Sequence, residues 1–95
     1  MPFGVNPERN GMAYFVYIVQ SEKDGTYYIG HTSNLSERLD RHNSGRSQYT
    51  KAKMPWRLVY QEAFDSKGAA IRREREIKAK KVREYIEHLV RTSRA

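Results

Sequence analysis

The stretch YFVYIVQ at residues 14–20 is aromatic or β-branched at every position but the last. Such residues favour strands, and a run that is apolar on both faces is typical of a strand covered on both sides. The segment SEKDG at residues 21–25 predicts a turn, with Asp24-Gly25 as its strongest signal. A second strand over residues 26–30 follows, so the two strands form a predicted antiparallel hairpin.

A helix is predicted after the hairpin, because Asn34 stands three residues before Glu37 in a capping pattern. Leu35, Leu39 and His42 form one stripe of this helix, and Ser44-Gly45 is a plausible end. Residues 46–55 (RSQYTKAKMP) predict a basic loop, and residues 56–64 (WRLVYQEAF) predict a third strand.

The last third of the chain is predicted to be helical. Asp65-Ser66 opens a helix that runs to about Ala79. A final amphipathic stripe follows at Val82, Tyr85, Ile86, Leu89 and Val90. Nothing between residues 78 and 82 breaks the backbone, so the pattern allows either one helix or two.

These elements give the order β-β-α-β-α-α and an α+β fold, a small three-stranded antiparallel sheet flanked by helices. With 95 residues the chain is long enough for one domain. We expect that domain at residues 14–91, preceded by a flexible arm at residues 1–13 and followed by a tail at residues 92–95.

Composition and charge limit the classes of function. The chain has no cysteine, no apolar run long enough to span a bilayer and no signal-peptide pattern, so a cytoplasmic location is expected. The net charge is +7, and most of the excess lies in residues 67–95, where ten Lys/Arg stand against four Asp/Glu. Such asymmetry favours a nucleic-acid partner, and the alternative is a solvated, lysine-rich helix face.

Glu74 is the most informative single residue. On a helix it falls between Ile71 and Ile77 with Ala70 beside it, whereas Glu76 projects to the opposite side. A carboxylate on an apolar stripe is costly unless it is paired with a cation or binds a metal. Both readings remain open from the pattern alone, and the metal reading suits Mg²⁺, which favours carboxylates, waters and phosphates.

Other candidate residues gain meaning only together. Arg38 and His42 are neighbours one helical turn apart, suited to phosphate binding and proton transfer but equally to a solvated helix edge. Tyr17 and Tyr28 lie in the two hairpin strands, where tyrosine is common.

Taken in order, these segments resemble the GIY-YIG nuclease family. Val16-Tyr17-Ile18 reads VYI in place of GIY, and Tyr28-Ile29-Gly30 is an intact YIG. The match continues through later segments and covers residues 14 to about 90. The chain is similar to small stand-alone members of the family and to the UvrC N-terminal nuclease domain. The later matching segments are Asn34-Leu35, Arg38, residues 41–45, residues 56–60 and residues 70–74.

The resemblance implies a metal-dependent DNA endonuclease that uses one Mg²⁺ or Mn²⁺ held by Glu74. Tyr17 would take the proton from the attacking water, which requires a pKa lowered by the metal, Arg38 or His42. Tyr28 would orient the water or phosphate, and Arg38 would neutralise transition-state charge. Gly30 would let the backbone turn closely into the site. The residues expected to grip neighbouring phosphates are Arg46, Lys51, Lys53, Arg72, Arg73 and Lys78.

Two departures from the family pattern limit this transfer. Repair-type members carry lysine where this chain has His31, and several members use an asparagine beyond the glutamate, which is missing here. Lys78 is expected to take over part of that role. His31 and His88 are expected to be ordinary surface residues.

The resemblance implies DNA as partner, a role in repair, recombination or processing, and a monomer, with a separate targeting protein as a further possibility. One rival is a non-catalytic nucleic-acid-binding module with a vestigial site. Another is a protein-interaction module that docks through the helix at residues 82–90. The second rival predicts an exposed apolar stripe there, whereas the nuclease interpretation predicts a stripe covered by the sheet.

Overall fold

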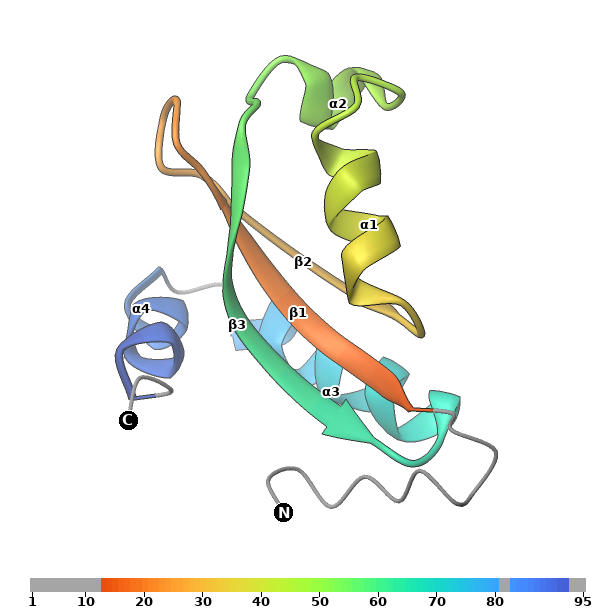
Figure 1. Ribbon diagram of the computed structural model, residues 1–95. Coiled ribbons are helices and arrows are strands. Elements are labelled where there is room, and N and C mark those ends of the chain that lie inside the picture. The colour runs from red at the N-terminus through yellow and green to blue at the C-terminus, as the bar shows by residue number, and fades with distance from the viewer. Residues whose placement is uncertain (1–12, 81–82, 93–95) are drawn as a thin grey trace.

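A computed structural model describes residues 13–80 and 83–92, and it contains the predicted sheet in this part of the chain (Figure 1). The strands are β1 (Tyr14–Ser21), β2 (Tyr27–Thr32) and β3 (Trp56–Phe64). They pair antiparallel in the order β2-β1-β3, so β1 is central, as its two-sided apolar pattern indicated. The predicted fold class and element order are confirmed.

Four helices surround the sheet in the described residues: α1 (Leu35–His42), α2 (Gln48–Lys51), α3 (Lys67–Lys80) and α4 (Arg83–Thr92). α1 begins as predicted, because the Asn34 side chain accepts a hydrogen bond from the Glu37 amide at 3.0 Å. The Ser66 hydroxyl likewise accepts from the Ala69 amide at the start of α3. The long helical stretch at the C-terminal end divides into α3 and α4.

Some predicted boundaries were wrong. The second strand runs two residues past Gly30, which places His31 in the sheet. The predicted loop at residues 46–55 contains the short helix α2. This helix is anchored to the core because Thr50 is buried and its carbonyl accepts a hydrogen bond from Trp56 Nε1 at 2.8 Å. Most of the predicted arm and tail lies outside the described residues, although Ala13 is buried and Thr92 still belongs to α4.

Each face of the sheet carries its own core, because successive strand residues point to opposite sides. On one face Val16 packs with Ala70 and Ile77 of α3, and side chains of α4 pack against this group. On the other face Tyr17, Val19 and Trp56 pack with Leu35 and Leu39, which belong to α1. Figure 1 shows α3 behind the sheet and α4 beside β3, and it shows α1 well apart from α3.

The stripe on α4 is covered in the way that the nuclease interpretation predicted. Tyr85, Ile86 and Leu89 are partly buried against the core of Val16, Ala70 and Ile77. Val82 lies outside the described residues. Within these residues the exposed large hydrophobic side chain is Tyr49, which is not on α4. The docking-helix rival therefore lacks the exposed stripe that it requires.

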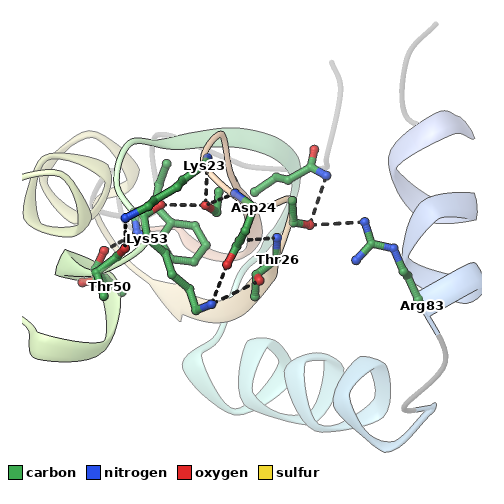
Figure 2. Close-up of polar contacts among 11 residues, drawn as sticks. Lys23, Asp24, Thr26, Thr50, Lys53 and Arg83 are labelled. Carbon is green, nitrogen blue, oxygen red and sulfur yellow. Dashed lines mark hydrogen bonds and ion pairs between the residues drawn. The ribbon is translucent and has the colours of Figure 1, made fainter.

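The tip of the β1–β2 hairpin is tied to the segment before β3, as Figure 2 shows. Lys53 Nζ lies 2.6 Å from the Asp24 carboxylate, and the Lys53 carbonyl accepts from Ser21 Oγ at 2.7 Å. From the other side, Arg83 of α4 donates to the Gly25 carbonyl at 3.3 Å. These contacts fix the hairpin and the segment between α1 and β3 relative to each other.

Candidate active site

The Tyr17 side chain extends over the neighbouring strand β2 at Gly30, a residue that has no side chain. Tyr17 pairs with Gly30 of β2 and is 2% exposed. A Cβ atom on Gly30 would lie 2.7 Å from the Tyr17 hydroxyl oxygen and 2.9 Å from its Cζ, which is closer than packing allows. The glycine that ends the YIG motif is therefore what lets the Tyr17 ring pass over β2.

The Tyr17 hydroxyl is joined to His42, the last residue of α1. Its oxygen lies 3.0 Å from His42 Nε2. Burial, then the charges of Arg38 and Arg41, lower the pKa of His42 below its ordinary value. In the neutral tautomer whose Nε2 carries no proton, the imidazole accepts this hydrogen bond and the phenol donates it.

Arg38 and His42 do not supply the lowered Tyr17 pKa that direct proton transfer to this phenol requires, and the effect of a metal stays a prediction. Burial raises the pKa of Tyr17 to about 12, aided by the nearby Tyr28 and Glu74, and Arg38 offsets only part of this. Desolvation disfavours the phenolate, as for any buried acid. Tyr17 is therefore protonated at neutral pH, and it can accept a proton only by passing its own to His42.

Tyr28, the tyrosine of the second motif, holds the imidazole from the side. Its ring centroid lies 4.7 Å from that of His42 in an edge-on arrangement and 6.5 Å from that of Tyr17. Trp56 closes the same cluster, with its centroid 6.0 Å from His42. These contacts leave His42 little freedom to turn away from Tyr17.

Arg38 lies one turn before His42 and has spare hydrogen-bonding capacity. One guanidinium nitrogen donates to the His31 carbonyl at 3.4 Å. Its Nε is buried and makes no hydrogen bond within the described residues, although Glu37 is 3.9 Å away. A buried donor without an acceptor is rare and costly, which suits a group that receives an anionic ligand.

A cleft of about 360 Å³ opens beside this guanidinium. Lys67, at the start of α3, contributes a second cation that the sequence interpretation did not single out. The cleft therefore offers an anion two positive groups and several hydroxyls. It is lined by Tyr14, His31, Thr32, Ser33, Arg38 and Lys67.

Glu74 lies on the inner side of α3, as the helical pattern predicted. It stands between Ala70 and Ile77, which are both fully buried, and its side chain is 14% exposed. Its carboxylate oxygens lie 2.5 Å from His31 Nδ1 and 2.6 Å from Lys78 Nζ. Burial acts to raise the pKa of Glu74, but the bonds from Lys78 and His31 outweigh it and leave the pKa below its ordinary value.

The expectation that His31 is an ordinary surface residue was wrong. His31 pairs with Val16 across the strands and so faces α3, where it meets Glu74. The alternation of side chains along β2 was the available signal, but the predicted strand ended one residue too early to use it. His88, by contrast, is exposed on α4.

The two halves of the site lie on opposite faces of the sheet and meet at β2, its edge strand. Tyr17, Arg38 and His42 belong to the α1 face, whereas Glu74 belongs to the α3 face. Arg38 donates to the backbone of His31, and the charge of Glu74 acts on the pKa of Tyr17. All five residues that the family resemblance marked as catalytic are thus gathered around this edge.

The residues around Glu74 fit a divalent cation that is held mainly by water and phosphate. Within the described ranges no three His, Cys, Asp or Glu side chains form a metal-binding group. Glu74 is ionised and partly exposed, which suits a single protein ligand of the Mg²⁺ type. Its partner Lys78 is 53% exposed and free to swing aside, which would open one carboxylate oxygen.

The predicted phosphate-binding cations divide into three groups. Arg46, Lys51 and Arg72 are exposed and have no acidic partner among residues 13–80 and 83–92. Lys53 is instead paired with Asp24 (Figure 2), and Arg73 is paired with Glu62 at 3.0 Å and with Glu76. The structure therefore assigns Lys53 and Arg73 to internal contacts, while Lys78 belongs to the Glu74 group.

Comparison with known proteins agrees with this geometry. A family model described as the GIY-YIG catalytic domain matches residues 13–85. The chain belongs to the GIY-YIG family. The residues that match include both strands of the hairpin, α1 and Glu74, and GIY-YIG domains are a family of nucleases.

Small bacterial proteins resemble this chain in sequence. UPF0213 proteins of Staphylococcus saprophyticus and Staphylococcus haemolyticus are 46% and 50% identical over 66 residues, which is 68% of this chain and 79% of each relative. The solution structure of a UPF0213 protein from Bacillus halodurans is 39% identical, with a TM-score of 0.55 over 85% of both chains. None of the helices in the described part of this GIY-YIG protein is long and apolar enough to cross a membrane.

Proposed function

We propose that this GIY-YIG protein is an endonuclease that hydrolyses phosphodiester bonds of DNA with the help of one Mg²⁺ or Mn²⁺ ion. The observation that carries the proposal is the hydrogen bond between the buried Tyr17 phenol and the neutral His42, beside a guanidinium that has a free donor. A structural aromatic core does not need a proton acceptor and an unsatisfied cation at the same edge.

The chain's own residues supply most of the chemistry. A water molecule beside Tyr17 gives its proton to the phenol oxygen as the phenol proton passes to His42 Nε2, a general-base step in two linked transfers. Arg38 binds the phosphate and neutralises the charge that grows on its oxygens. Tyr28 keeps His42 in place. An ion held by Glu74 would add Lewis-acid stabilisation of the phosphate and the leaving oxygen.

The proposal is tested with purified protein and a panel of branched, nicked and single-stranded DNAs, with Mg²⁺, with Mn²⁺ and with a chelator. We expect cleavage of at least one DNA that depends on the metal. In Glu74→Gln, which keeps the shape of the side chain but removes its charge and one of its two acceptor oxygens, the rate should fall at least about 100-fold, a typical loss for a group that stabilises the transition state. DNA binding in the chelator should stay within about twofold.

Glu76→Gln is the matched control, because Glu76 is on the same helix, 61% exposed and paired with Arg73. It should cut DNA at nearly the wild-type rate. Wild-type cleavage by Glu74→Gln would remove Glu74 as the metal ligand. Tight DNA binding without cleavage of any DNA would favour the alternative, a binding module in which His31 and Lys78 simply neutralise a vestigial Glu74.

A further inference from the structure

The structure presents one aromatic ring to solvent beside the candidate active site. Tyr49 on α2 is 52% exposed, and it is the exposed large hydrophobic side chain among the described residues. Its ring centroid lies 6.1 Å from that of Tyr28, which in turn packs against His42. A chain of rings therefore runs from the proton-transfer pair to the surface.

The helix that carries Tyr49 is firmly held even though it has only four residues. The next residue, Thr50, is 2% exposed, and its carbonyl accepts from the buried Trp56 indole at 2.8 Å. The Tyr28 ring packs against the Tyr49 ring. The exposed ring is thus fixed in position, which is what a stacking surface needs, rather than left loose as a surface side chain.

The surroundings of the ring are positively charged. Arg46 precedes α2 and Lys51 ends it, and both are exposed with no acidic partner among residues 13–80 and 83–92. Figure 1 shows α2 directly after the end of α1, which bears His42. An exposed aromatic ring on α2, with one such cation just before the helix and another at its end, matches a nucleotide, whose base stacks while its phosphates pair with the charges.

We propose that Tyr49 is a stacking platform for an unpaired base next to the scissile phosphate. The protein therefore prefers DNA that is single-stranded on that side. In a duplex the bases are stacked on their neighbours, so Tyr49 could not reach a base face without unstacking it. This inference rests on the proposed function for the position of the scissile phosphate, but the binding that it predicts does not require cleavage.

The test measures binding in a chelator, by fluorescence anisotropy, of a single-stranded oligonucleotide and a duplex of the same length. Tyr49→Ala should weaken single-strand binding about tenfold, whereas Tyr49→Phe, which keeps the ring, should bind within about twofold of wild type. Duplex binding should change less than twofold in both variants. Gln48→Ala, an exposed neighbour on α2, is the matched control and should bind both DNAs normally.

A second measurement reports stacking directly. An oligonucleotide that contains one 2-aminopurine should be quenched by wild-type protein and by Tyr49→Phe but not by Tyr49→Ala. Equal single-strand affinities for all three proteins, with equal quenching, would overturn the platform while leaving the nuclease proposal intact. Failure of wild-type protein to bind either DNA at low salt would overturn both.

Discussion

At the scale of single residues, the proposed mechanism uses the Tyr17 phenol and the His42 imidazole as one proton acceptor. The pKa of Tyr17 is about 12, and the pKa of His42 is lowered, so near pH 7 the phenol is protonated and the imidazole is neutral. The neutral imidazole is the active form. The cleavage rate should therefore be constant near neutral pH and fall only as the pH drops through the lowered His42 pKa, below its ordinary 6.5.

Variants of this pair separate the two roles. Tyr17→Phe should lose at least about 100-fold in rate at every pH, because no other hydroxyl carries the proton to His42. His42→Ala should move the pH–rate profile to higher pH, because the proton must then stay on Tyr17. Tyr28→Phe is the control and should keep most of the activity. Single-turnover cleavage across pH measures all three, and a normal rate for Tyr17→Phe would exclude the relay.

Gly30 makes a prediction about stability as well as activity. In Gly30→Ala the new methyl group would lie 2.7 Å from the Tyr17 hydroxyl oxygen and 2.9 Å from its Cζ, so the phenol must move from its present position against His42. Overpacking of this kind costs about 1–3 kcal/mol, a fall in thermal midpoint of at least about 4 °C for a chain of this size. Cleavage should fall with it, because the hydrogen bond to His42 is lost.

Two further variants identify the cause of the Gly30 effect. Among the described residues, the methyl group of Gly68→Ala on α3 would meet only Arg72, at 3.7 Å, so this control should leave stability unchanged or raise it slightly. In a Tyr17→Phe background the hydroxyl that lies nearest is gone, so Gly30→Ala should cost less than in wild type. Additive effects of the two substitutions in thermal unfolding would show that the close contact with Tyr17 is not the cause.

At the scale of elements, the sequence predicted what depends on local pattern. The aromatic and β-branched run at residues 14–20 gave β1, and the helical spacing placed Glu74 on the buried side of α3. The contacts that complete the site join residues far apart in the sequence. His31 and Glu74 are separated by 43 positions and Tyr17 and His42 by 25, and no local pattern reports such pairs.

Charge alone also did not distinguish a lysine that is paired within the protein from one that is not. Lys51 and Lys53 have the same local sequence context, and both were predicted to bind phosphate. Asp24 is 29 residues from Lys53 and comes beside it only because the hairpin folds back onto the segment before β3 (Figure 2). The hydrogen bond from Lys53 lowers the pKa of Asp24 well below its ordinary range.

This difference between the two lysines is testable. Lys53→Met should lower the thermal midpoint by a few degrees, with DNA affinity nearly unchanged, because the side chain serves the hairpin. Lys51→Met should leave the midpoint unchanged and weaken binding, with the slope of log affinity against log salt reduced by about 1. Thermal unfolding and binding titrations at several salt concentrations measure both. Equal loss of DNA affinity in the two variants would contradict the assignment.

At the scale of the whole molecule, the candidate site lies at the β2 edge of the sheet rather than in a pocket on one face of it. The α1 face carries Tyr17, His42 and Arg38, the proposed proton path and phosphate ligand, and the α3 face carries the Glu74 carboxylate. The two meet only because β2 is an edge strand that carries a glycine at Gly30.

The net charge of +7 does not say which cations are available to DNA, because several cations are paired within the protein. Arg46, Lys51, Lys67 and Arg72 are among those without an acidic partner in the described ranges. If two to four of these bind duplex phosphates, raising salt from about 50 to 200 mM should weaken binding roughly 10- to 150-fold. Anisotropy titrations of one duplex at several salt concentrations give the slope. Lys53→Met should leave it unchanged, and an affinity that is independent of salt would exclude phosphate contacts as the basis of binding.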